Sequence, residues 1–150
     1  MLTIGYQDTS AATLVILLLL CFLVSVSDIR RRRIPNVLSL LILVLCSLGF
    51  KNSPCLESAL VVLIGGLILG KAGLIAYGDI KLATALSTAI PLNYLWYATS
   101  YTVLVGGILS IIYAIKYRWL LATPKGSDPG LPYGVAICSG FLVTIVLSNL

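Results

Sequence analysis

Long apolar runs separated by short polar segments constrain this sequence more than any other feature. The chain is 59% hydrophobic and only 10% charged, and its mean hydropathy is +1.08. A soluble domain has about 25% charged residues, and a globule of this size cannot bury so much apolar surface. We therefore expect residues 1–150 to form one integral membrane domain, whose runs cross the lipid as helices because a helix satisfies its own backbone hydrogen bonds.

The apolar runs predict an all-α fold, a polytopic membrane helix bundle with about six transmembrane helices. The run at 80–90 covers only about half of a ~30 Å hydrocarbon core, so it either extends by a turn or is a half-buried element held by its neighbours. No Lys or Arg precedes the first run, which is therefore expected to remain as a span and not to be a cleaved signal peptide. Gly66 and Gly70 have the spacing that lets helix backbones approach closely. The predicted spans are residues 11–26, 37–50, 59–75, 80–90, 95–115 and 131–150.

The positions of Lys and Arg predict the orientation of the bundle. If the loop after the first span is cytoplasmic, nine basic residues lie on the cytoplasmic side and Lys51 alone lies on the other side, as the positive-inside rule requires. Both termini then lie outside the cytoplasm. Orientation and contact with anionic membrane lipids account for the net charge of +5, which does not indicate nucleic-acid binding. The nine residues are Arg30, Arg31, Arg32, Arg33, Lys71, Lys81, Lys116, Arg118 and Lys125.

Two aspartates stand out, because carboxylates beside membrane spans are costly and usually functional. Asp28 follows the first run and Asp79 precedes the fourth, and both fall on the predicted cytoplasmic face. Each also has a structural explanation: Asp28 could pair with Arg31 or Arg32 one helical turn on, and Asp79 could stabilise a helix N-terminus. Together they supply the two carboxyl groups that an aspartic protease requires, because two close carboxylates share one proton and so supply a base and an acid.

No metal or cofactor is expected. The chain has no histidine, which is the commonest metal ligand and general base. Its four cysteines form no C-x-x-C pair, so neither a zinc site nor a disulfide framework is indicated. Gly78, beside Asp79, is expected to allow an unusual backbone conformation or the close approach of another segment.

Three blocks of the sequence resemble the prepilin peptidases, also called type IV leader peptidases, which are intramembrane aspartyl proteases with a G-x-G-D motif. Asp28 with Ile34-Pro35-Asn36 resembles the first catalytic block of that family, Gly78-Asp79-Ile80-Lys81 the second, and Leu131-Pro132-Tyr133-Gly134 the C-terminal block. The resemblance implies that Asp28 and Asp79 are the catalytic residues. The other motif residues would then support the site: Ile34, Pro35, Asn36, Gly78, Lys81, Pro132, Tyr133 and Gly134.

The same resemblance implies the substrates and the branch of the family. Its substrates are prepilins and pseudopilins, in which a short basic leader precedes an apolar helix and is removed after a glycine at the cytoplasmic face of the inner membrane. The large segment with paired cysteines found in the methylating members is absent, which points to the small peptidase-only branch that serves tight-adherence (Flp-type) pili. Ala76 stands where the first glycine of the motif would be, which is the one departure from the pattern.

Two other functions are compatible with the sequence. The chain could be a non-catalytic membrane subunit of a pilus or secretion assembly, in which both aspartates only orient the protein. It could also be a small proton-coupled transporter, in which the aspartates carry protons. A transporter would need further polar residues deep in the spans, where this sequence has only scattered Ser and Thr.

Overall fold

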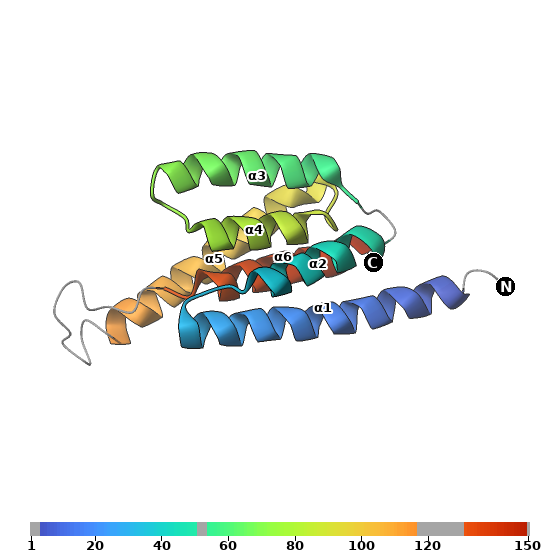
Figure 1. Cartoon of the computed structure of the whole chain (residues 1–150), viewed down its shortest axis with the longest axis horizontal. Helices are drawn as coiled ribbons and strands as arrows, with labels where there is room; N and C mark the ends of the chain where they lie inside the picture. The colour runs from blue at the N-terminus through green and yellow to red at the C-terminus, as the bar shows by residue number, and fades with distance from the viewer. Residues whose placement is uncertain (1–3, 51–53, 117–130, 150) are drawn as a thin grey trace.

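The computed structural model describes residues 4–50, 54–116 and 131–149, without the side chains of residues 4–10. Within these residues the chain forms six α-helices and one short 3-10 helix and no strand, which confirms the predicted all-α helix bundle (Figure 1). The elements are α1 (Ile4–Arg31), α2 (Asn36–Leu48), α3 (Leu56–Lys71), α4 (Tyr77–Ser87), η1 (Leu92–Tyr94), α5 (Leu95–Ala114) and α6 (Tyr133–Asn149).

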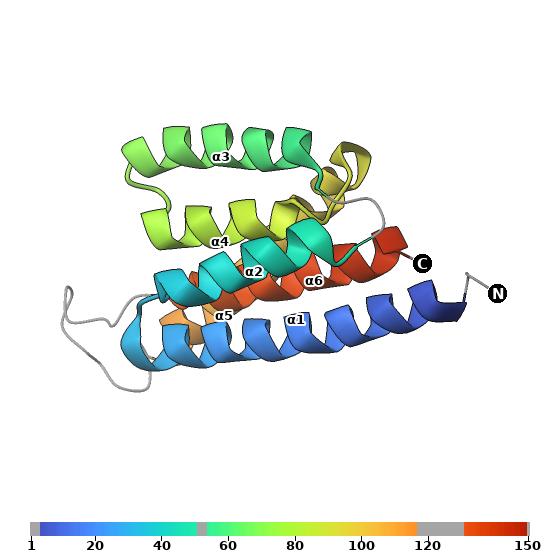
Figure 2. The same cartoon turned by 45° about the vertical axis from the view of Figure 1, so that its right-hand side comes forward.

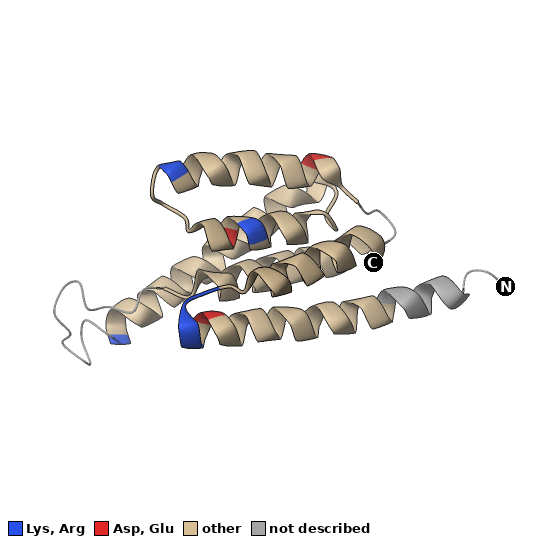
Figure 3. Ribbon diagram, in the orientation of Figure 1, with Lys and Arg blue, Asp and Glu red and all other residues tan. Residues whose placement is uncertain are grey.

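Successive helices run in opposite directions, so one end of the bundle collects the last turns of α1, α3 and α5 and the first turns of α2, α4 and α6 (Figures 1 and 2). The Lys and Arg residues of the described helices lie towards this end, which we call the basic end (Figure 3). Glu57, in the first turn of α3, lies at the opposite end. Of the residues used to predict orientation, Lys51, Arg118 and Lys125 lie outside the described residues.

The two innermost helices are α4 and α6. Helix α4 packs against α2, α3 and α6, and α6 packs against α1, α4 and α5. With 11 residues, α4 is about 16 Å long at 1.5 Å per residue, too short to cross a hydrocarbon layer by itself. It begins at Tyr77, three residues before the predicted run, and ends at Ser87, and its neighbours hold it in place. The core around it draws on every α-helix except α3: Leu17, Cys21, Val24, Ile42, Cys46, Phe50, Leu82, Ala85, Leu86, Ala89, Ile90, Leu95, Ala98, Ile137, Cys138, Phe141 and Ile145.

Helix α3 lies outside this core and contacts α4 through glycines. A Cβ atom on Gly66 would lie 2.7 Å from a methyl carbon of Ile80, and one on Gly70 would lie 2.9 Å from another. The close-packing role predicted for these two glycines is thus confirmed. The predicted end of this span was wrong, because α3 stops at Lys71 and the turn that follows has Gly73 at φ +74°, in the left-handed region that glycine adopts without strain.

The outer surface of the bundle is apolar. Two helical segments, Ala11–Arg31 and Leu92–Ala114, are long and apolar enough to cross a membrane by length and composition, while α2 and α6 are apolar but shorter. Large side chains such as Phe22, Trp96 and Val103 are at least 65% exposed. Apolar surface on this scale is unfavourable in water and is stable against lipid, as expected for a membrane protein.

Candidate active site

The two aspartates singled out in the sequence approach each other at the basic end. Asp28 lies in the last turn of α1 and Asp79 in the first turn of α4, where the acidic residues are coloured in Figure 3. Asp28 is only 6% exposed and Asp79 is half-buried. Burial raises the pKa of Asp79 to about 6, and the nearby charge of Asp28 raises it as well. Burial raises the pKa of Asp28 as well, while a backbone hydrogen bond from Gly134 and the charge of Arg32 lower it. The charge of Asp28 reaches Asp79, so the two carboxyl groups lie near each other.

A backbone hydrogen bond from α6 holds Asp28 in place. The N–H of Gly134 donates to Oδ2 of Asp28 at 2.8 Å, across 106 residues of sequence. A Cβ atom on Gly134 would lie 2.8 Å from the same oxygen and 3.2 Å from the carboxyl carbon. Pro132, just before the helix, is buried. Gly134 is thus needed for close approach, because no larger residue leaves room for the carboxylate.

Gly78 does not have the role expected from the sequence. It lies inside α4, its φ is outside the left-handed region, and a Cβ atom there would meet only Cβ of Ile34 at 3.8 Å, an ordinary contact. Ala76, which precedes α4, is exposed and extended (φ −75°, ψ 144°), a conformation open to any residue. This backbone therefore needs neither an unusual conformation at Gly78 nor the missing first glycine of the motif.

Asp79 faces an apolar groove of about 380 Å³ that is bounded by α3, α4, α5 and α6. Gly65 of α3 and Thr99 of α5 contribute to its walls, and Tyr133, the first residue of α6, lies on the α6 side. Asp79 is the one ionisable carboxylate among the lining residues. The groove therefore offers a place where an apolar segment can lie with one of its peptide bonds beside a carboxyl group.

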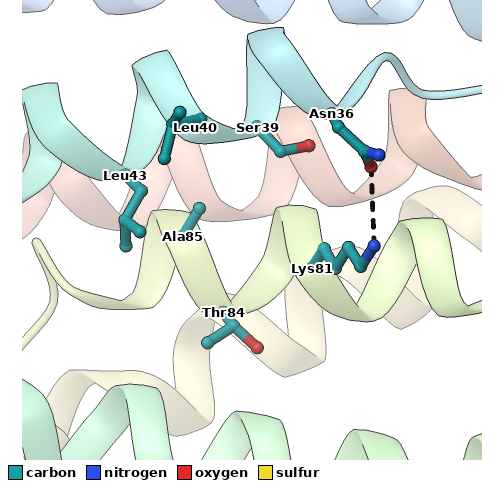
Figure 4. Close-up of a pocket in the computed structure, with 7 residues that line it drawn as sticks. All are labelled: Asn36, Ser39, Leu40, Leu43, Lys81, Thr84 and Ala85. Carbon is teal, nitrogen blue, oxygen red and sulfur yellow. Dashed lines mark hydrogen bonds between the residues drawn. The ribbon is translucent and has the colours of Figure 1, made fainter.

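Two other motif residues meet on a different side of α4. Lys81 Nζ donates to Asn36 Oδ1 at 3.5 Å, in an open pocket of about 230 Å³ between α2 and α4 (Figure 4). Ser39 and Thr84 add hydroxyl groups to the same pocket. The Asn36 and Lys81 side chains therefore link the first two motif blocks to each other, but they do not line the groove that contains Asp79.

Ile34 and Pro35 shape the connection between α1 and α2. Ile34 is half-buried and packs against the core. Pro35 is exposed and stands immediately before α2 with φ −62° and ψ 131°, where its missing N–H costs the helix nothing. Both residues therefore set the path of the chain, and neither lines the groove.

One arginine of the basic run differs from its neighbours, and sequence reasoning did not separate it from them. Arg30, Arg31 and Arg33 are exposed, whereas Arg32 is half-buried. Its guanidinium carbon lies 5.2 Å from the centre of the Tyr113 ring on α5, and Nη2 donates to the Tyr113 hydroxyl at 3.4 Å. Four consecutive arginines carry no local signal that distinguishes one from another, so only the packing shows it.

The arrangement is suited to acid–base chemistry with two carboxyl groups. Among the described residues, no three His, Cys, Asp or Glu side chains gather into a group that could hold a metal ion. Two interacting carboxyl groups share a proton, so one can accept a proton while the other donates one.

One family comparison gives a match. The model of the type IV leader peptidase family matches residues 15–115, a segment that contains both aspartates but ends before Gly134. No curated protein and no solved structure matches the chain.

Gly78 and Gly134 form a matched pair for mutation, because each is the second residue of its helix and follows a tyrosine. Gly134→Ala should break the hydrogen bond to Asp28 and lower the free energy of unfolding by about 1–3 kcal/mol. Gly78→Ala should raise it by up to about 1 kcal/mol, because alanine favours the helix and has room. Thermal unfolding of the two variants in detergent measures both effects. Equal changes in the two variants would contradict the special role of Gly134.

Proposed function

The chain belongs to the type IV leader peptidase family, and from this we propose that it is a membrane-embedded aspartic endopeptidase with Asp28 and Asp79 as its catalytic pair. Its substrates are prepilin-like proteins, from which it removes the leader peptide. The observation that carries the proposal is the meeting of two carboxyl groups from α1 and α4 at one end of the bundle, where burial raises the pKa of Asp79 and the charge of Asp28 raises it further. A peptidase of this type needs one carboxylate and one carboxylic acid at the same time.

The chemistry follows from the shared proton. The ionised carboxylate accepts a proton from a water molecule, whose oxygen attacks the carbonyl carbon of the peptide bond. The protonated carboxyl group donates its proton to the carbonyl oxygen, which gives a tetrahedral diol. Transfer of a proton to the amide nitrogen then breaks the carbon–nitrogen bond, and the amine and the new carboxyl end leave. Of the remaining motif residues, Gly134 holds Asp28 and Tyr133 lines the groove beside Asp79. Ile34, Pro35, Asn36, Lys81 and Pro132 support the helices that carry the pair, whereas Gly78 needs no special role.

We place the apolar part of the substrate in the groove beside Asp79. The groove is almost wholly apolar and opens between helices that are themselves apolar on the outside. A segment lying there would bring a peptide bond next to the Asp79 carboxyl group without exposing its apolar side chains to water. This fits a substrate in which an apolar helix follows the cleaved leader.

We also propose that the protein is a multi-pass inner-membrane protein with its basic end at the cytoplasmic face. The described Lys and Arg residues gather at that end (Figure 3), and cytoplasmic loops carry an excess of positive charge. The exposed arginines after α1 would then contact anionic lipid headgroups. In this orientation the catalytic pair meets substrates from the cytoplasmic side, as expected for the Flp-type branch, and both chain termini lie on the other side.

The catalytic proposal is tested by replacing each aspartate with asparagine, which keeps its size and polarity but cannot exchange the shared proton. Asp28→Asn and Asp79→Asn should each reduce cleavage of a co-expressed prepilin by at least about a thousandfold, and the double variant should be no worse, because residues acting as one unit are not additive. Leader removal is read by immunoblot, with membrane insertion as the control. Substantial cleavage by a normally inserted single variant would favour the assembly-subunit alternative.

The groove is tested by filling it. A Cβ atom at Gly65 would meet nothing within 4 Å, so Gly65→Leu should fold normally while placing a side chain in the groove. We expect the KM for a prepilin to rise by about tenfold or more. Gly107 of α5 is the matched control, because a Cβ atom there also meets nothing within 4 Å and the residue does not line the groove. The same KM in both variants would place the substrate elsewhere.

The orientation is tested by the chemistry of Cys55, the half-buried cysteine that precedes α3 at the end opposite the aspartates. Cys21, Cys46 and Cys138 are buried, so a membrane-impermeant thiol reagent should label Cys55 selectively from outside the inner membrane. Burial and the carboxylate of Glu57 raise the pKa of the Cys55 thiol, so the labelling is best done at mildly alkaline pH. A Cys55→Ser variant is the control. Labelling only from the cytoplasmic side would reverse the proposed orientation.

A further inference from the structure

We propose that the open pocket between α2 and α4 binds one anionic phospholipid, with Lys81 and Asn36 at the phosphate and the leucines of α2 beside the first part of an acyl chain. The pocket, of about 230 Å³, lies on a different side of α4 from the groove that contains Asp79. It is therefore a second site, and the proposal depends on the protein lying in a membrane, not on its peptidase activity.

The lining of the pocket changes from polar to apolar along its length. Two helix faces meet there, each built from residues three or four apart, which share one side of a helix. The lining residues are Asn36, Ser39, Leu40 and Leu43 on α2 and Lys81, Thr84 and Ala85 on α4 (Figure 4). Asn36 begins α2 at the basic end, and Leu43 lies about 10 Å deeper at 1.5 Å per residue. A phospholipid has the same order, because its phosphate lies at the membrane face and its acyl chains lie inside.

The positive charge in the pocket has no negative partner there. The Lys81 side chain is exposed, and its one hydrogen bond within the described part of the chain goes to Asn36 Oδ1 at 3.5 Å. None of the residues that line the pocket is acidic. The amide of Asn36 adds N–H donors beside the ammonium group. A positive charge with neighbouring donors and no carboxylate is suited to a phosphate oxygen.

The hydroxyl of Ser39 is an independent observation that points to a ligand. Ser39 is only 8% exposed, and its hydroxyl lies in the pocket one turn deeper than Asn36 (Figure 4). It has no hydrogen-bond partner among the described residues, whereas the Thr84 hydroxyl donates to the carbonyl of Ile80 at 2.8 Å. A nearly buried donor without a partner is unfavourable. The ester and phosphate oxygens of a phospholipid would supply the missing acceptor.

The apolar half of the pocket favours a lipid over a soluble phosphate. Leu40 is 60% exposed and Leu43 is 36% exposed, so both present apolar surface directly inside the polar groups. An acyl chain would cover this surface, and a free phosphate would not. Helix α2 begins after Pro35, which provides no side-chain cap, so the positive end of its dipole also favours an anion. A lipid held there would contact α2 and α4 together and stabilise the packing of the helix that carries Asp79.

The test compares Lys81→Met with Lys71→Met. Each variant removes one exposed positive charge from the basic end, but Lys71, in the last turn of α3, does not line the pocket. Phosphatidylglycerol is titrated into the purified protein in a neutral detergent, and bound lipid is counted by native mass spectrometry. Lys81→Met should weaken the binding of the tightest lipid by about fivefold or more. Lys71→Met should change it by less than about twofold, because solvent screens an exposed charge outside the site.

Asn36→Asp provides a second variant, which decides the test if Lys81→Met does not fold. It keeps the size of the side chain, and a carboxylate suits the first turn of a helix. The new carboxylate should neutralise Lys81 and repel the phosphate, so phosphatidylglycerol should bind about tenfold more weakly or less. Unchanged binding in both Lys81→Met and Asn36→Asp would overturn the proposal. Equal losses in Lys81→Met and Lys71→Met would overturn it too, because they would show attraction by surface charge without a site.

Glycerol 3-phosphate separates a lipid from a soluble phosphate. It carries the phosphate without an acyl chain, so it should not displace phosphatidylglycerol when both are present at the same concentration. Full displacement would assign the pocket to a soluble phosphate ester and overturn the lipid assignment. None of these results bears on the proposed peptidase activity, which is tested separately by Asp28→Asn and Asp79→Asn.

Discussion

The hydrogen bond between the Gly134 backbone and the Asp28 carboxylate is the contact on which the candidate site depends. It joins the last turn of α1 to the first turn of α6 across 106 residues, and it requires a bare backbone at Gly134. Since α6 also packs against α4, the same contact positions Asp28 relative to Asp79. A buried carboxyl group without such a partner would be costly. Burial raises the pKa of Asp28, and this hydrogen bond offsets part of that effect.

The short helix α4 separates two environments. Asp79 faces the apolar groove bounded by α3, α5 and α6, whereas Lys81, two residues later, faces α2 and Asn36 (Figure 4). Residues two apart on a helix point in different directions. The motif block Gly78-Asp79-Ile80-Lys81 therefore contributes one side chain to the groove and another to the pocket between α2 and α4. The helices that pack around α4 hold its carboxyl group at the basic end, although α4 is too short to cross a hydrocarbon layer by itself.

The basic run after α1 combines two kinds of arginine. Arg30, Arg31 and Arg33 are exposed and suited to lipid headgroups, whereas Arg32 is turned into the bundle and placed against Tyr113. The distinction has an electrostatic consequence. A half-buried charge is screened less by solvent than a charge on the surface, so Arg32 and its exposed neighbours have different electrostatic surroundings.

Much of the fold was predictable from the sequence, because apolar runs and their polar breaks are local patterns. The runs predicted six helices in order, and the two spans between Asp28 and Asp79 place both aspartates at one end, since each span reverses the direction of the chain. What lies beside each aspartate depended on tertiary packing. Gly134 contacts Asp28 from far along the chain, Gly78 proved to be an ordinary helical residue, and Arg32 is identical in sequence to its three neighbours. Local sequence determines which segments form helices and in which direction they run, whereas the contacts between distant segments are decided only when the helices pack.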